Sequence, residues 1–255
     1  MIKLAIHRMP HFAHIRNSIY FITLALLIGA PVRSFGQLRL DDIKLTRIEH
    51  KKIREYIAGQ IKSGKHQFSE IHTSWKKGKE LTPYSRYDMT FSLNGSLQNI
   101  WKGYLSADPS KLWNGRNISF GLLLQRSPNR IFYIHDSIRG IDTGQIYFLN
   151  LKVLLGLVAL PVAFEIITID GTEKEIDFSY LEDNKSVGVQ KIRFREVDGC
   201  HTEILHTSYF KSDSRFRDKW LYPIFHKKLV NEFHGNMKKL IVAGNLPDQQ
   251  SLHPF

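Results

Sequence analysis

The sequence predicts an α+β fold in which a series of β-hairpins is followed by one long C-terminal helix. Alternating apolar and polar residues over 87–93 indicate a half-buried strand. The Asp-Gly pairs at 170–171 and 198–199 each separate two strand-like runs, which is typical of β-hairpins. Residues 221–243 repeat apolar side chains at helical spacing, so we expect one long helix to close the domain.

Residues 1–36 have the order of an export signal. Three basic residues and three histidines precede an uncharged apolar run at 19–30, and small residues follow it up to Gly36. The run is shorter than the roughly 20 residues that span a bilayer as a helix. We therefore predict cleavage after Gly36 and a periplasmic or extracellular protein. An uncleaved membrane anchor is the alternative.

Charge and composition limit the partners of the chain. The formal net charge is +12, and without the four Lys and Arg residues of the export segment 32 of them stand against 24 Asp and Glu, a charge of +8. Such a surplus favours anionic partners, for example an anionic membrane surface. The basic residues form no run of five or six, so nucleic-acid binding is not expected. Cys200 is the only cysteine, which excludes an intrachain disulfide.

Residues 37–83 are predicted to hold an N-terminal helix and a linker or loop. Apolar residues from Leu38 to Ile61 lie on one helical face among lysines and arginines, and Gly64 is a plausible end of the helix. The polar stretch 62–83 then forms the linker or loop. A basic amphipathic helix can lie on an anionic membrane, but packing of this helix on the domain is the favoured interpretation.

Four elements are predicted between the first strand and residue 135. Ser96 is placed to cap a helix with an apolar stripe, formed by Leu97, Ile100, Trp101, Tyr104 and Leu105. The Asp-Pro pair at 108–109 begins a second, short helical turn. Residues 118–124 and 130–135 are predicted as strands on either side of a Ser-Pro-Asn turn.

The stretch 145–169 is almost continuously apolar, but Gly156 and Pro161 interrupt it. These breakers favour two buried strands joined near 156–161 over a membrane span. Glu182-Asp183-Asn184-Lys185 marks a further turn between strands.

The register of the two Asp-Gly hairpins follows from the turn length that places similar side chains opposite each other. Three-residue turns with a glycine bulge do this best. They predict the following pairs: Phe164 with Ile176, Val162 with Phe178, Ile192 with Ile204, and Gln190 with His206.

The final helix is predicted over 221–243, with Pro223 in its first turn and Gly244 after its end. Its predicted core face consists of Leu221, Ile224, Phe225, Leu229, Phe233, Met237, Leu240 and Ile241.

No motif along the chain demands a particular chemistry. His201 and His206 point to opposite faces of a strand, and His226 and His234 lie about two turns apart on a helix, so no metal site is expected. Nucleophile-elbow, dinucleotide-binding and Walker patterns do not occur. The side chains of Tyr133, His135 and Asp136 form a candidate acid–base group, which we call the group at 133–136. The favoured interpretation is that His135 is an ordinary surface histidine. No catalytic residue, metal or cofactor is therefore predicted.

The order of these elements resembles the START-like (SRPBCC) superfamily of polyketide cyclases and lipid-binding proteins. Two shape motifs carry the resemblance, SLQNIWKGYLSADP at 96–109 and LPVAFE at 160–165. The resemblance covers 84–244, before a C-terminal tail at 245–255. It implies a helix-grip fold, in which a curved antiparallel β-sheet is wrapped around a long C-terminal helix, with an apolar cavity for a lipid, sterol or polyketide between the two. About eight candidate strands and the helix near 42–61 depart from the family pattern.

Together, the export segment and the resemblance predict an exported protein that holds a hydrophobic small molecule or lipid. We expect the ligand-binding residues to be Trp101, Phe164, Phe178, Tyr180, Gln190 and His206. One alternative is an enzyme of cyclase, dehydratase or hydrolase type on the same scaffold. The other is a membrane-surface protein that binds through the basic helix near 42–61.

Overall fold

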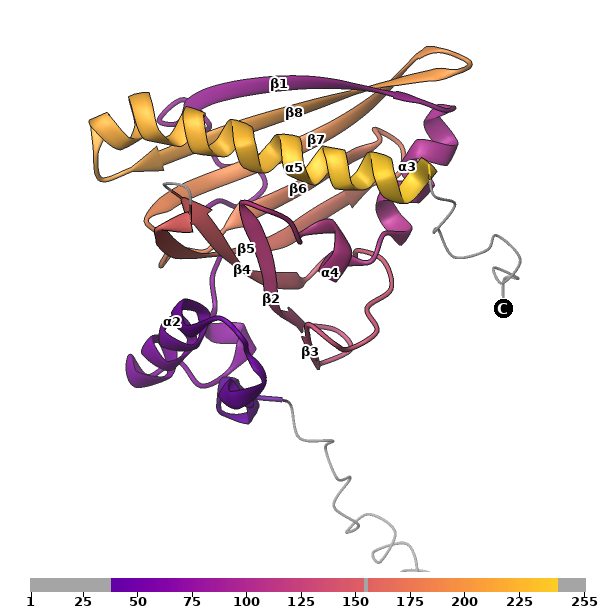
Figure 1. The fold of residues 1–255 in the computed structure, drawn as a ribbon. Helices are drawn as coiled ribbons and strands as arrows, with labels where there is room; N and C mark the ends of the chain where they lie inside the picture. The colour runs from indigo at the N-terminus through magenta and orange to yellow at the C-terminus, as the bar shows by residue number, and fades with distance from the viewer. Residues whose placement is uncertain (1–37, 154–155, 243–255) are drawn as a thin grey trace, which may run out of the picture. The chain divides into compact units, whose positions relative to one another are not determined.

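A computed structural model describes residues 38–153 and 156–242 (Figure 1). The predicted export segment, 1–36, and the predicted tail, 245–255, lie outside these residues. The described residues belong to one compact unit. Among the described residues, no helix combines the length and the hydropathy that a membrane span requires.

An eight-stranded antiparallel sheet with the order β1-β8-β7-β6-β5-β4-β2-β3 forms the centre of the fold. Its strands are β1 (Ser85–Asn94), β2 (Ile118–Gln125), β3 (Arg130–Tyr133), β4 (Gln145–Val153), β5 (Val158–Asp170), β6 (Glu175–Tyr180), β7 (Ser186–Asp198) and β8 (His201–Ser212). The predicted strands are all present, and the apolar stretch 145–169 forms two of them. Pro161 lies inside β5, opposite Asn150, rather than in the connection.

The predicted register of the β5–β6 hairpin is wrong by four residues at Phe164 and Ile166, and by five between the irregularity of the pair and the turn. Phe164 lies opposite Tyr180, and Ile176 lies opposite Ile169. Gly171 does not take the left-handed conformation that a glycine bulge needs; in this turn Lys174 does, with φ of 51°. The chain therefore makes a longer turn, and the irregularity of the strand pair lies between Ile166 and Thr168 instead.

The β7–β8 hairpin also differs from the prediction, by two residues. His206 lies opposite Ile192 rather than opposite Gln190, and the bulge falls between Glu196 and Asp198. Gly199 is not left-handed either. The shifts at Phe164 and at His206 are even, and a shift by an even number of residues leaves a side chain on its face, so the predicted inner face survives both corrections at these residues.

Two short helices follow β1 and begin at the predicted caps. In α3 (Leu97–Ser106), the Ser96 hydroxyl accepts a hydrogen bond from the backbone N–H of Asn99 at 3.4 Å. In α4 (Pro109–Leu112), the Asp108 carboxylate accepts one from the N–H of Ser110 at 2.9 Å. Both side chains satisfy backbone donors that have no partner within the helix.

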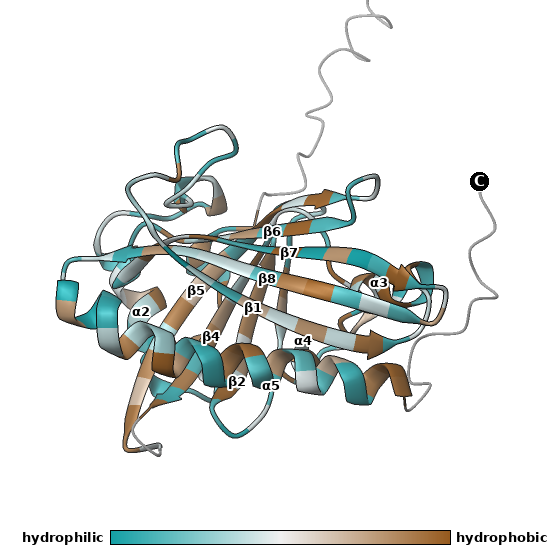
Figure 2. Ribbon diagram, turned by 90° about the horizontal axis from the view of Figure 1, so that it is seen from above, coloured by the Kyte–Doolittle hydropathy of each residue, from teal (hydrophilic) through white to brown (hydrophobic). Residues whose placement is uncertain are grey.

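The long helix α5 (Tyr222–Val242) lies across one face of the sheet, as predicted (Figures 1 and 2). A single π-helical turn, Arg217–Leu221, precedes it. The predicted core face is confirmed for Phe233 and Met237, which are buried, and for Leu229, Leu240 and Ile241, which pack against the same core. The buried face also includes His226, Val230 and His234, which were not predicted. Leu221 and Ile224, predicted to face the core, are exposed. The helix has apolar side chains on more than one face, and packing against the sheet determines which of them are buried.

Polar contacts attach the C-terminal half of α5 to the loop before β2. The Glu232 carboxylate accepts hydrogen bonds from the backbone N–H of Asn117 at 2.9 Å and from its side-chain amide at 2.7 Å. Asn236 donates to the carbonyl oxygens of Leu112 and Asn114 at 3.1 and 3.0 Å. This half of the helix is therefore fixed to the connection between α4 and β2 by directional bonds as well as by packing.

The N-terminal segment packs against the other face of the sheet. The predicted helix 38–61 is shorter than expected: 3-10 turns occupy its start, and α2 runs only over Lys51–Lys62. Ile53 and Ile57 of α2 are fully buried. The segment 62–83, predicted as a linker or loop, is a loop that contributes to the core through Phe68, Ile71 and Trp75.

The sheet separates two cores because neighbouring residues on a strand point to opposite faces. Leu123 and Tyr147 belong to the core under α5, which also contains α3 and α4. Leu122 and Phe148, one residue away on the same strands, belong to the core under α2.

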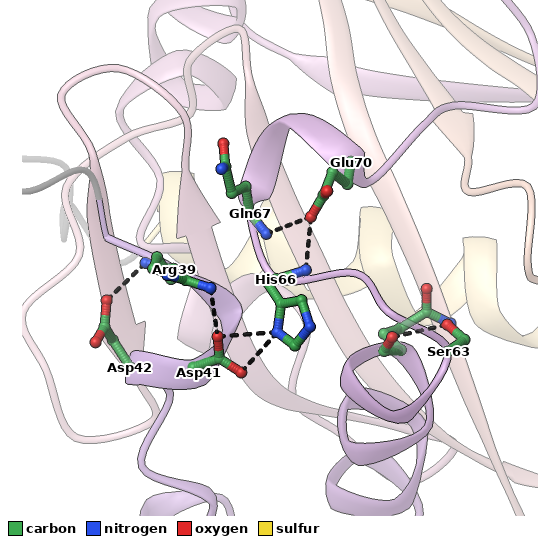
Figure 3. Close-up of polar contacts among 8 residues, drawn as sticks. Arg39, Asp41, Asp42, Ser63, His66, Gln67 and Glu70 are labelled. Carbon is green, nitrogen blue, oxygen red and sulfur yellow. Dashed lines mark hydrogen bonds and ion pairs between the residues drawn. The ribbon is translucent and has the colours of Figure 1, made fainter.

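Hydrogen bonds within the N-terminal segment hold its loops together (Figure 3). The Glu70 carboxylate accepts from the backbone N–H groups of His66 and Gln67, both at 2.6 Å. The His66 ring lies 3.0 Å from the Asp41 carboxylate. These bonds therefore fix the conformation of the N-terminal segment where it packs on the sheet.

Candidate functional site

Three polar side chains from neighbouring strands meet on the face of the sheet that α5 covers. They are Tyr180 on β6, Gln190 on β7 and His206 on β8. The amide nitrogen of Gln190 donates a hydrogen bond to the Tyr180 hydroxyl at 2.6 Å, and its amide oxygen lies 2.7 Å from Nε2 of His206. All three side chains are buried.

Helices α3 and α5 extend this row of hydrogen bonds. Nε2 of His234 lies 2.9 Å from Nδ1 of His206, and Nδ1 of His234 lies 2.7 Å from the hydroxyl of Tyr104 on α3. At the other end, the hydroxyls of Tyr180 and Tyr222 lie 2.9 Å apart. We call this row the polar chain; its members are Tyr104, His234, His206, Gln190, Tyr180 and Tyr222.

A third buried histidine lies beside the polar chain. Nε2 of His226 is 2.5 Å from the Ser208 hydroxyl. Its ring stacks on Tyr222 with centroids 4.8 Å apart, and it meets His206 edge to face at 5.8 Å. His226 therefore has its own hydrogen-bond partner and shares the apolar surroundings of the polar chain.

The orientation of the Gln190 amide sets the direction of the hydrogen bonds in the polar chain. Since its oxygen can only accept, Nε2 of His206 must donate to it. In a neutral imidazole the other nitrogen then accepts, so His234 donates to His206. Nδ1 of His234 is left to accept from Tyr104. Each of the four groups therefore has at least one hydrogen-bond partner, as buried polar groups require.

Burial keeps the histidines uncharged. It lowers the pKa of His226 and of His234 to about 3. Burial lowers the pKa of His206 well below its ordinary value, and the neighbouring His234 and His226 lower it further. Histidines with such low pKa values are weak general bases at neutral pH. The polar chain is therefore better suited to recognising a hydrogen-bonding group than to acid–base catalysis.

Burial acts in the opposite direction on the tyrosines. It raises the pKa of Tyr180 to about 12, although hydrogen bonds from Tyr222 and Gln190 oppose the shift. Burial also raises the pKa of Tyr104 well above its ordinary value. These hydroxyls stay protonated at neutral pH and remain available as donors.

Aromatic side chains form the rest of the inner face. Phe164 stacks on Tyr147 with centroids 5.1 Å apart and contacts Phe178 at 4.9 Å. Trp113 lies between Phe164, at 5.2 Å, and Phe233 of α5, at 4.3 Å. These rings interlock across the space between the sheet and α5.

The interior contains two small cavities within the described residues. The larger has a volume of about 40 Å³; its polar border includes Gln190, His206 and His226, and its apolar wall includes Leu151 and Leu229. The smaller, of about 20 Å³, lies among aromatic side chains. One water needs about 10–15 Å³ of such space, so the larger cavity has room for roughly three. The ligand-sized cavity implied by the family resemblance is therefore not open in this structure, because the interlocked rings fill it.

The structure brings together five of the six predicted ligand-binding residues. Phe164, Tyr180, Gln190 and His206 border the larger cavity. Phe178 borders the smaller one. Trp101 borders neither. It packs edge to face on Phe194 with centroids 5.3 Å apart, and the Lys174 ammonium lies 5.4 Å from its ring.

The two histidines of α5, His226 and His234, were not among the predicted site residues. His226 and His234 share the spacing of Val230, Phe233 and Met237, which is the only signal that the sequence offers. Each of the two meets a different residue of β8: His226 meets Ser208, and His234 meets His206. In the described part of the chain, no three ligating side chains converge on a metal site.

The candidate acid–base group at 133–136 serves instead to hold the N-terminal segment. The Tyr133 hydroxyl accepts from the backbone N–H of Lys44 at 2.8 Å. The Asp136 carboxylate binds the Arg47 guanidinium, also at 2.8 Å. His135 is exposed, as expected for a surface histidine, and lies 3.2 Å from Glu49.

No family model and no curated protein matches this sequence. Solved structures do match. Norcoclaurine synthase from Thalictrum flavum has a TM-score of 0.46 at 12% identity, over 64% of this chain and 98% of that one. A Thermus thermophilus protein has a TM-score of 0.46 at 8% identity, over 63% and 99%. Major latex-like protein 151 from Panax ginseng has a TM-score of 0.42 at 14% identity, over 64% and 99%.

The sequence motifs at 96–109 and 160–165 resemble the START-like superfamily, and that resemblance implies a helix-grip fold. The eight-stranded antiparallel sheet with its C-terminal helix is the helix-grip arrangement which that resemblance implied. At such identities and TM-scores these matches assign no chemistry to this chain.

Proposed function

We propose that this domain binds a small molecule with an apolar body and one hydrogen-bonding group, held between the sheet and α5. The main support for this function is the lining of the larger cavity. It is bordered by Gln190, His206 and His226 on one side and by apolar side chains elsewhere. Binding sites for small molecules combine these features, an apolar wall with a few convergent polar groups.

The volume of about 40 Å³ requires that the site opens before a ligand enters. Ligand pockets typically measure about 300–1,000 Å³. The contacts of Glu232 and Asn236 fix the C-terminal half of α5. The larger cavity is bordered by His226 and Leu229, which precede these contacts along the helix. Outward movement of the N-terminal half, away from β4 and β5, would therefore enlarge the cavity without breaking the contacts of the other half.

The first test identifies a ligand carried by the protein. The protein is purified from its producing cells, extracted with organic solvent, and the extract is analysed by mass spectrometry. We expect one class of apolar compound in about equimolar amount, absent from a parallel extract of an unrelated protein. An extract without such a compound would count against the proposed function.

A second test uses two leucines on the same helix. Leu229 borders the larger cavity, whereas Leu240 packs on the same core but borders neither cavity. Leu229→Ala should increase binding of a fluorescent apolar probe because it widens the site, and Leu240→Ala should not. Equal probe binding by the two variants would show that the probe reports general loosening, and would contradict a specific site.

Export is part of the same proposal and rests on the order of residues 1–36. The expected product is a periplasmic or extracellular chain that begins at Gln37. Fractionation of the producing cells and the intact mass of the purified protein test this. A chain that keeps residues 1–36 and sediments with membranes would favour the uncleaved anchor instead.

A further inference from the structure

Basic and apolar side chains share the surface of residues 215–228, which join β8 to the first turns of α5. Phe216 is 63% exposed, Trp220 55%, Ile224 53% and Leu221 37%. Large apolar side chains clustered on a surface mark interaction sites, whereas single ones do not. We call residues 215–228 the basic-aromatic segment.

The charge of the basic-aromatic segment is strongly positive. It contains five basic residues, Arg215, Arg217, Lys219, Lys227 and Lys228, and one acid, Asp218, which gives a formal charge of +4. The Asp218 carboxylate is turned to the chain itself and accepts from the backbone N–H of Ser212 at 3.0 Å. Arg217 pairs with Asp213 at 2.7 Å. The other four basic side chains have no ion-pair partner among the described residues.

We propose that the basic-aromatic segment docks on an anionic phospholipid surface. Tryptophan and phenylalanine insert at the boundary between headgroups and acyl chains, and lysine and arginine beside them contact the anionic headgroups. A second copy of the chain fits this surface poorly. A symmetric dimer through the segment would bring two charges of +4 together.

Helix α2 is also basic, but its buried isoleucines cannot insert into a membrane. Ile53 and Ile57 of α2 are fully buried against the sheet. The basic residues Lys51 and Lys52 of α2 both lie near Glu55, at 3.8 and 2.8 Å. The structure therefore assigns membrane contact to the start of α5 and not to the helix near 42–61 that the sequence suggested.

The docking surface lies near the larger cavity. Figures 1 and 2 both place the β4–β5 hairpin beside the N-terminal half of α5. Leu157 and Val158 of this hairpin are exposed, by 87% and 37%. A membrane contacted by the basic-aromatic segment would meet the part of α5 that has to move if the cavity opens. Docking itself does not depend on the proposed ligand-binding function.

Tryptophan fluorescence offers a direct test of docking. Of the four tryptophans, Trp75, Trp101 and Trp113 are at most 8% exposed, so Trp220 reports alone on contact with lipid. The experiment uses residues 37–255, because residues 38–242 form a compact unit with its own cores and the apolar run 19–30 would bind vesicles by itself. We expect a blue shift with phosphatidylglycerol-containing vesicles and none with pure phosphatidylcholine. Trp220→Phe should abolish the shift while the protein still floats with the anionic vesicles.

Two matched charge reversals locate the contact. Lys227→Glu with Lys228→Glu should lower partitioning onto anionic vesicles by at least about tenfold, since each basic residue near such a surface contributes about 1 kcal/mol. Lys51→Glu with Lys52→Glu makes the same charge change on α2 and should have a much smaller effect. Circular dichroism confirms that each variant is folded.

Three results would overturn docking by this segment. One is the absence of both flotation and blue shift. Another is an equal loss of binding in the two double variants, which would indicate attraction by net charge alone. The third is a dimer in solution that Trp220→Ala dissociates, which would assign the surface to self-association. A ligand recovered by solvent extraction would remain unaffected by any of the three.

Discussion

Nδ1 of His206 on β8 lies 2.9 Å from Nε2 of His234 on α5, and both imidazoles are buried. This contact joins the sheet to the last helix by a hydrogen bond between two neutral rings. A second proton on His206 would occupy Nδ1, the nitrogen that accepts from His234. Protonation there therefore disrupts the contact as well as placing a charge in the core.

Acid should destabilise the protein below pH 6.5. The buried histidines have lowered pKa values, so the unfolded chain binds more protons than the folded one between pH 6.5 and about 3, and the free energy of unfolding rises with pH across this window. The stabilisation by neutral histidines is fully present above pH 6.5. At pH 5 the two histidines with a pKa of about 3, His226 and His234, should each cost about 2 kcal/mol.

Urea unfolding at pH 7, 6 and 5 measures this dependence. Two histidine variants separate the buried groups from the rest. His226→Leu should reduce the slope against pH by about one proton, while His135→Ala, at an exposed position, should leave it unchanged. Stability that is constant from pH 7 to pH 5 in the wild type would contradict the neutral state assigned to these rings.

Gln190→Leu should lower the free energy of unfolding by about 2 kcal/mol. The substitution removes the acceptor of His206 and the donor to Tyr180, and it leaves two buried polar groups without their partner. Gln98→Leu on the exposed side of α3 is the matched control, with an expected change within about 0.5 kcal/mol. Equal effects of the two substitutions would show that the polar chain does not contribute to stability.

Gly115→Ala should destabilise the protein through Glu232. A Cβ atom at residue 115 would lie 1.5 Å from the Glu232 carboxylate oxygen, so the carboxylate must leave Asn117. We expect a loss of about 1–3 kcal/mol. In a Glu232→Ala background the same substitution should cost almost nothing, which a double-mutant cycle measured by thermal or urea unfolding will show. Additive effects would mean that the glycine is needed for another reason.

Arg126→Lys should loosen the loop that crosses the outer face of the sheet. Arg126 forms a two-point ion pair with Glu165, at 2.7 and 2.9 Å, and donates to the carbonyl oxygens of Phe68 and Ile71. Lysine cannot make this set of bonds. Amide exchange of residues 66–75 should accelerate, and stability should fall by about 2 kcal/mol. Arg195→Lys, in an exposed pair with Glu203, is the control and should change neither.

Local patterns were sufficient to predict most elements of this fold. The alternation along β1, the Ser96 and Asp108 caps and the apolar spacing of α5 depend on interactions within a few residues, so the sequence encodes them directly. The inner-face position of Tyr180, Gln190 and His206 was also predictable. It depends only on the two-residue period of a strand, and it survived two errors in register because both were even at these residues.

Only the tertiary structure determines the strand register, which side chains of α5 are buried, and how far side chains fill the interior. The conformation of the turns at Gly171 and Gly199 depends on how the strands on either side pair within the sheet, and the Asp-Gly pair does not determine it. On α5, apolar side chains lie on more than one stripe, and only packing against β8 brings His226 and His234 inward. The filling of the interior depends on rings from distant segments meeting in space, which no local pattern specifies.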